Sequence, residues 1–225
     1  DTVRDAARDC GVVVATGDTK VVPRGQCDGL YLHTAGVGER YPELDPAADR
    51  VAPGDAVLVS GTLADHGFAI LQAREQLAVE GGAMSDTGPV HRLVEACRAA
   101  GDAIHFLRDP TRGGLAAVLN ETVEGRTLDV TLEESALPLS PGTRALSELL
   151  GIDPLNVASE GRVVLLCDPR AADDVLAAWR ERPEGRGAQR IGSVAQGQGR
   201  VILSTLGGGR RLVDVPRGEL LPRIC

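Results

Sequence analysis

The sequence predicts an α+β fold in which helices and strands form packed layers. From about residue 53 onward, segments with helical spacing alternate with short apolar runs, and some of those runs are neighbours in sequence. The 225 residues are enough for one large domain or two small ones. Only 2% of the residues are aromatic, so the core must be built from Val, Leu, Ala and Ile.

The start of the chain predicts one helix and two strands. We interpret residues 2–9 as the end of a helix, and the apolar runs at 11–17 and 28–38 as strands. The chain opens on Asp1 rather than Met, and we interpret this as the loss of an N-terminal part of the natural protein. Pro and Asp are frequent in residues 41–55, which predicts a boundary between two domains.

Beyond this boundary each element follows from its local pattern. Apolar runs and turn residues predict strands at 55–61, 102–109, 126–133 and 162–169, and helices at about 63–78, 88–101, 110–124, 141–150 and 170–182. Glycines between two apolar runs predict a hairpin at 189–203. The predicted domains are residues 1–50 and 51–213, and a tail at 214–225 carries Cys225.

Composition argues against several classes of function. A formal charge of −8 disfavours nucleic acids and anionic membranes as partners, because both require clustered Lys and Arg. No apolar run approaches about 18 residues and no signal peptide opens the chain, so neither a transmembrane helix nor secretion is predicted. The five cysteines contain no C-x-x-C pair, and their apolar settings suggest buried thiols in a reducing cytosol.

The segment RDPTRGG at 108–114 joins a predicted strand to the glycine-rich start of a helix. Such a turn presents backbone N–H groups and the positive end of a helix dipole to an anion. Asp109 is a candidate for holding a metal or capping the turn, and Arg112 for pairing with phosphate. Thr111, Gly113 and Gly114 complete the candidate phosphate site. An ordinary capped turn explains the same pattern equally well.

Two further segments contain candidate site residues. Asp18, Thr19 and Lys20 follow an apolar run and are suited to a phosphate–magnesium unit, although a solvated hairpin explains them more simply. Glu160 directly precedes a predicted buried strand and is a candidate general base, although a turn residue is the simpler interpretation. We interpret His66, at a predicted helix start, as a cap or a packed surface residue.

Six segments together resemble the HypE family of hydrogenase maturation factors, the carbamoyl dehydratases. They are TGDTKVV, GLYLHTAGVG, VSGTLADHG, RDPTRGGLAAVLNE, NVASEG and the terminal LPRIC. The resemblance runs along the whole chain, and the pairing of DPTRGG with a terminal PRIC is highly specific. The family is similar to the aminoimidazole ribonucleotide (AIR) synthetase, or PurM-like, superfamily of ATP-using enzymes. This implies that residues 1–50 end an N-terminal ATP-binding domain that forms a homodimer, and that residues 51–213 are the AIR synthase-like C-terminal domain.

The resemblance also implies a reaction in the cytoplasm. In the family, the carbamoyltransferase HypF places a carbamoyl group on the terminal thiol, here Cys225. ATP-dependent dehydration then gives a thiocyanate, whose cyano group passes to the HypC–HypD iron scaffold for the [NiFe] hydrogenase site. Glu160 would be the base that removes protons from nitrogen, and Lys20 would stabilise the oxygen or the phosphate, so the two are expected to lie close together. Asp18 and Asp109 would contact Mg²⁺ or the nucleotide, and residues 111–114, with Thr19, the phosphates.

A hypothesis of another class remains open. Family members carry a further N-terminal segment with glycine-rich and acidic ATP-binding elements, and this sequence does not contain it. The chain could therefore be a non-catalytic carrier that docks the transferase through its tail and cannot use ATP. A hydrolase using Cys225 with His66 is disfavoured, because a terminal nucleophile lacks a fixed base and oxyanion donors.

Overall fold

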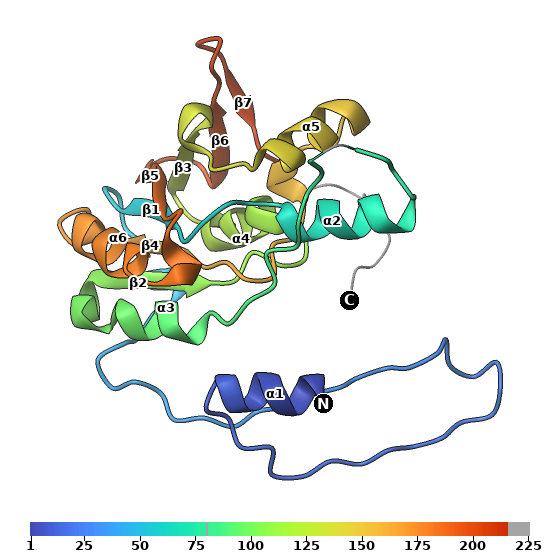
Figure 1. Cartoon of the computed structure of the whole chain (residues 1–225). Helices are drawn as coiled ribbons and strands as arrows, with labels where there is room; N and C mark the ends of the chain where they lie inside the picture. The colour runs from blue at the N-terminus through green and yellow to red at the C-terminus, as the bar shows by residue number, and fades with distance from the viewer. Residues whose placement is uncertain (80, 216–225) are drawn as a thin grey trace. The chain divides into compact units, whose positions relative to one another are not determined.

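The structure, a computed structural model, describes residues 1–79 and 81–215. It divides into two compact units, Asp1–Tyr41 and the chain from Pro42 onward, and each unit is described by itself (Figure 1). This division lies upstream of the domain boundary predicted at residue 51. No helix within the described ranges combines the length and the hydropathy that a membrane span requires.

The first unit contains one helix, α1 (Thr2–Asp9), in which Arg8 pairs with Asp5 one turn earlier. The prediction of strands at 11–17 and 28–38 is wrong: the structure assigns no strand to these described residues. Their apolar side chains are exposed, with Val13 at 85% and Tyr31 at 71%. A strand is stable only when its N–H and C=O groups pair with those of a neighbouring strand. Within residues 1–41 the two apolar runs do not pair with each other.

The second unit is built on a mixed sheet of seven strands in the order β2-β4-β1-β5-β3-β6-β7. Only β3 and β6 pair in parallel, and the other neighbours are antiparallel. The strands are β1 (Ala56–Val59), β2 (Ile104–Arg108), β3 (Leu128–Glu133), β4 (Val164–Cys167), β5 (Gln189–Gln196), β6 (Arg200–Ser204) and β7 (Arg210–Leu212). The layered α+β class is therefore confirmed.

In the described part of the second unit, five α-helices accompany this sheet: α2 (Asp65–Arg74), α3 (His91–Ala96), α4 (Gly114–Val123), α5 (Pro141–Leu150) and α6 (Ala172–Arg180). Short 3-10 turns occupy Ala48–Arg50, Arg98–Ala103, Glu134–Ala136, Pro154–Asn156 and Pro183–Gly185. Two predicted helices are shorter in the structure. The helix expected to reach residue 78 ends at Arg74, shortly before Gln76 adopts a left-handed φ of 51°. The helix expected at 88–101 becomes α3 and a 3-10 turn that contains a non-helical Gly101.

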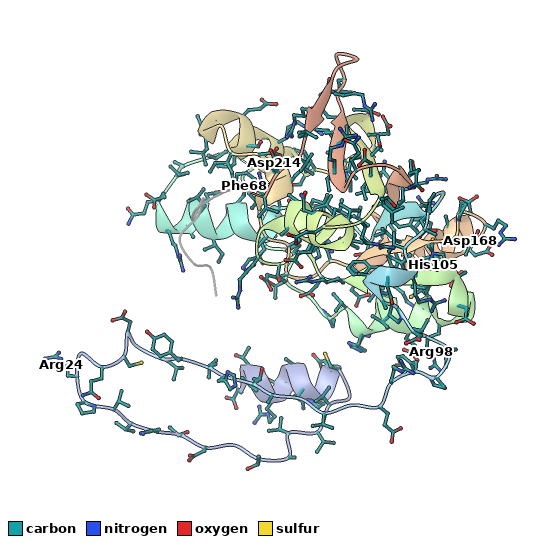
Figure 2. The ribbon with its side chains drawn as sticks, turned by 180° about the vertical axis from the view of Figure 1, so that it is seen from behind. Arg24, Phe68, Arg98, His105, Asp168 and Asp214 are labelled. Carbon is teal, nitrogen blue, oxygen red and sulfur yellow. The ribbon has the colours of Figure 1, made fainter. Side chains whose placement is uncertain are left out.

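Helices lie on both faces of the sheet. Leu115 and Leu119 of α4 share a buried cluster with Val57 and Val59 of β1. Side chains alternate along a strand, so Leu58 points to the opposite face, and α6 contacts β1 as well. At the sheet edge, His105 of β2 lies near Asp168, which follows β4 (Figure 2). The core is made mainly of aliphatic residues, as the composition predicts, and the aromatic Phe68 and Trp179 are fully buried with them.

The hairpin predicted at 189–203 is wrong, because β5 and β6 do not pair with each other; β3 lies between them. Asp129 of β3 explains this arrangement. Its Oδ1 accepts the backbone N–H groups of Gln198 at 2.7 Å and Arg200 at 3.0 Å, and its Oδ2 accepts the Arg200 guanidinium at 2.7 Å. The turn is thereby bound to β3 and directs β6 to the far side of that strand.

We expect Asp129→Asn to lower the free energy of unfolding by about 2 kcal/mol at pH 7, because it removes charge-assisted hydrogen bonds. The Arg200 guanidinium lowers the pKa of Asp129 from 3.8 to about 2. This depressed pKa contributes stability that is fully present above pH 4 and is lost as the pH falls towards 2. Urea unfolding at several pH values should show that acidification lowers the free energy of unfolding less in the variant than in the wild type. An unchanged acid dependence would contradict the assignment, and Asp173→Asn, at an exposed position of α6, is the control.

Candidate functional site

The loop before β4 is where three parts of the second unit meet. Ser159 is buried, and its Oγ accepts the N–H of Ala64 at the start of α2, at 2.8 Å. The Ser159 N–H donates to the carbonyl of Pro110, in the turn before α4, at 3.0 Å. This one serine therefore brings the ADHG, DPTRGG and NVASEG segments together.

Glu160 is half-buried at this junction. Burial is the main cause that raises its pKa, and the neighbouring Asp109 and Asp86 raise it further, while His66 and Arg112 act in the opposite direction. Asp109 and Arg112 themselves are exposed. The structure thus groups Glu160 with two residues of the predicted anion-binding turn, which lie about fifty positions away in sequence.

In the turn before α4, the backbone packs closely against the backbone of residues 155–157. Gly113 and Gly114 have φ values of +73° and +60°, and a Cβ on Gly114 would lie 2.6 Å from the carbonyl oxygen of Leu155. Gly113 is the N-cap of α4 and supplies no side chain to cap it. The first-turn N–H groups of a helix without a capping side chain are suited to an anion, and that of Gly114 already donates to the carbonyl of Thr111 at 2.9 Å. The phosphate contacts predicted for this turn stay a prediction.

We expect Gly114→Ala to be strongly destabilising. The left-handed φ costs an L-residue about 1–2 kcal/mol, and the new Cβ would also meet Val157 O at 2.7 Å and Val157 N at 2.8 Å, which adds about 1–3 kcal/mol. Gly125→Ala is the matched control, since its φ is +69° but nothing lies within 4 Å of its Cβ. Thermal unfolding should show a clearly larger loss of stability for Gly114→Ala than for Gly125→Ala. Equal losses for the two variants would show that the backbone contact at 114 is unimportant.

The start of α2 contains site residues that the sequence did not indicate. Asp65 is buried, and its carboxylate accepts hydrogen bonds from three hydroxyl groups: Thr62 at 2.5 Å, Ser140 at 2.6 Å and Thr143 at 2.6 Å. The last two belong to the N-terminus of α5, so Asp65 links the starts of two helices. Ala64 adopts a left-handed φ of +67° although it is fully buried. Strained, buried backbone of this kind is found preferentially at functional sites.

His66 was interpreted from the sequence as a cap or packed surface residue, and the structure gives it two side-chain partners. Its Nδ1 lies 2.9 Å from Ser85 Oγ and 3.1 Å from Thr87 Oγ1. Between these two residues lies Asp86, which sequence reasoning missed. The segment around it has neither helical nor strand periodicity, and Ser, Asp, Thr and Gly together signal only a turn.

The remaining predicted residues lie outside the second unit or outside the described residues, so the predicted proximity of Lys20 to Glu160 stays a prediction. Asp18, Thr19 and Lys20 belong to the first unit and are exposed, and Asp18 Oδ1 accepts the Thr19 N–H at 2.8 Å. Cys225 lies outside the described residues. Within the part of the chain that the structure describes, no group of three or more His, Cys, Asp or Glu side chains could hold a metal ion. The Mg²⁺ ligands predicted at Asp18 and Asp109 therefore stay a prediction.

Two of the other cysteines are unsuited to nucleophilic chemistry. Cys97 and Cys167 are buried, and burial raises their pKa values to about 11 and about 12. The thiolate is the reactive form, so both are almost entirely unreactive at neutral pH. Cys10 and Cys27 are partly buried.

The chain is similar to several known proteins. The family described as "AIR synthase related protein, C-terminal domain" matches residues 52–204. The carbamoyl dehydratase HypE of Bradyrhizobium diazoefficiens is 50% identical over 222 residues, which are 98% of this chain and 64% of that protein. The chain therefore spans less than two thirds of the length of this relative.

Solved structures are also similar. A crystal structure of the hydrogenase maturation protein HypE in complex with ATP matches with a TM-score of 0.89 and 40% identity, over 98% of this chain and 68% of the other. A HypE–HypF complex matches with a TM-score of 0.87 and 34% identity, over 96% and 70% of the two chains. Both structures share the fold of this chain over nearly all of its length.

Proposed function

Since this chain belongs to the HypE family of AIR synthase-related proteins, we propose that it serves hydrogenase maturation by ATP-dependent dehydration of a carbamoyl group on the Cys225 thiol. The product is a thiocyanate that supplies the cyanide ligand of the active-site iron. The observation that carries the proposal is the position of Glu160. It is a half-buried carboxylate of raised pKa beside a glycine-rich helix start.

The reaction requires removal of the elements of water from S–C(=O)NH2. Glu160 accepts the protons that leave the nitrogen one at a time, because burial raises the pKa of its half-buried carboxylate. Burial also raises the pKa of Asp86, but that side chain is only 1% exposed. ATP, when bound, supplies the phosphoryl group that turns the carbonyl oxygen into a leaving group. The backbone N–H groups after Gly113 hold a phosphate, and Arg112 offsets its charge.

The other assignments are proposed because the chain belongs to this family. Lys20 stabilises the carbonyl oxygen or the phosphate, and Asp18, Thr19 and Asp109 contact the nucleotide or Mg²⁺. HypF is the proposed donor of the carbamoyl group, supported by the similar HypE in complex with HypF. Transfer to the HypC–HypD scaffold, a homodimer and a cytoplasmic location are proposed in the same way.

The proposal is tested by mass spectrometry on a protein of the relatives' full length that contains this chain. With HypF and a carbamoyl donor, the peptide that ends in Cys225 gains a carbamoyl group. Addition of ATP then removes the mass of one water. A carbamoylated peptide that stays unchanged with ATP would contradict dehydration and favour the carrier hypothesis. ATP binding measured by calorimetry separates the two further, because a carrier needs no nucleotide.

A further inference from the structure

We propose that Asp86 is the positioning residue of Glu160, fixing the backbone of the loop that presents the general base. The inference rests on the proposed function for the role of Glu160. The evidence for positioning is independent of that function and comes from the contacts that Asp86 makes.

Asp86 contacts both peptide groups that flank the Glu160 side chain. Its Oδ1 accepts the N–H of Glu160 at 3.0 Å. A Cβ on the following Gly161 would lie only 1.9 Å from the carbonyl oxygen of Asp86 and 2.8 Å from the N of Gly88. The backbone around Asp86 thus packs directly on the backbone after Glu160. Hydrogen bond and packing together fix the direction in which the Glu160 side chain leaves the loop.

The Asp86 segment is itself fastened to α2. His66, in the first turn of that helix, contacts Ser85 Oγ and Thr87 Oγ1, the two hydroxyl groups on either side of Asp86. Those hydroxyl groups also lie 2.8 Å from each other, and the Thr87 N–H donates to Ser85 Oγ at 3.2 Å. Asp86 is therefore held at a fixed place relative to the helix whose N-terminus also binds Ser159.

The second oxygen of Asp86 forms an ion pair with Arg162 but, among the described residues, no hydrogen bond. The side chain is 1% exposed, and Oδ2 has no hydrogen-bond partner among the described residues. Arg162 Nε lies 3.6 Å from it but donates its hydrogen to the carbonyl of Thr62 at 2.9 Å. A buried carboxylate oxygen with an ion pair but no hydrogen bond is incompletely satisfied, so the hydrogen bond of Asp86 within this group is the one that its Oδ1 makes to Glu160. Burial accordingly raises the pKa of Asp86.

Asp86→Ala and Asp86→Asn separate positioning from mere folding. Alanine removes the acceptor of the Glu160 N–H, whereas the amide oxygen of asparagine restores it. In this chain, hydrogen exchange read by NMR should show the Glu160 amide protected in the wild type and in Asp86→Asn. In Asp86→Ala the same amide should exchange at least about tenfold faster. Asp173→Asn, at an exposed position of α6, is the control for loss of an aspartate charge.

The second measurement is dehydration in a protein of the relatives' full length. We expect Asp86→Ala to lower the turnover about 10- to 100-fold with carbamoyl transfer and the KM for ATP unchanged, and Asp86→Asn to recover most of it. Fast hydrogen exchange of the Glu160 amide in the wild type would overturn the proposal. This measurement is made on the wild type and therefore does not depend on the folding of any variant. Wild-type turnover in Asp86→Ala would overturn it as well. A wild type without any dehydration would instead overturn the proposed function, while the exchange experiment still decides on Asp86.

Discussion

Glu160→Gln leaves carbamoyl transfer to the chain unchanged and lowers thiocyanate formation by at least about 100-fold. The amide is nearly isosteric with the carboxylate, so the Asp86 bond to the backbone N–H of residue 160 stays. What is lost is the group that accepts protons from the carbamoyl nitrogen. Quenched-flow samples analysed by mass spectrometry should therefore contain the carbamoylated and not the dehydrated thiol.

The pH dependence gives a second test of the same residue. A base acts only when deprotonated, and the pKa of Glu160 is raised above its ordinary value of 4.5. The acid limb of the dehydration rate should therefore lie above pH 4.5, and Glu160→Gln should remove it. Glu95→Gln, an exposed carboxylate on α3, should change neither rate nor limb. Retention of full turnover in Glu160→Gln would exclude Glu160 as the base.

Cys225→Ala abolishes carbamoylation, and Cys97→Ala does not. The expectation for Cys225 comes from the sequence and the family, since this residue lies outside the described part of the chain. The expectation for Cys97 comes from the structure, where burial raises its pKa to about 11 and leaves almost no thiolate at neutral pH. Intact-mass measurement after incubation with HypF should show one added group in Cys97→Ala and none in Cys225→Ala. A carbamoyl group on any other thiol of Cys225→Ala would contradict the role proposed for the terminal cysteine.

The sequence predicted those features that depend on neighbouring residues. The glycines before α4 and the apolar spacing after them placed both the turn and the helix, and Glu160 was singled out from its position before a strand. What failed depends on residues far away in the chain. The residues between β5 and β6 have the sequence pattern of a hairpin turn. In the structure, however, N–H groups of this turn donate to Asp129, about seventy positions earlier in the chain. The runs at 11–17 and 28–38 have the composition of strands, but composition supplies no pairing partner.

The site shows the same limit. Nothing near Glu160 in sequence indicates that Asp86 accepts its N–H, because the 74 positions between them include two strands and three α-helices. Buried polar residues in irregular segments have no periodicity that could reveal them. Asp65 is a similar case: its three hydroxyl partners come from two helix starts that are distant in sequence.

The three hydroxyl groups on the buried Asp65 carboxylate also determine how this region opens. Fraying of the first turn of α5 would strip Asp65 of the Ser140 and Thr143 hydrogen bonds and leave a buried charge poorly solvated. The start of α2 is bound in turn to Ser159 through Ala64. Local unfolding of either helix start is therefore coupled to the other, and both are coupled to the loop that carries Glu160. The β6–β7 hairpin, which projects from the sheet (Figure 1), is held instead by the pairing of β6 with β3 and by the ion pair of Arg211 with Asp153 at 2.5 Å, so its opening does not deprive Asp65 of a hydroxyl partner.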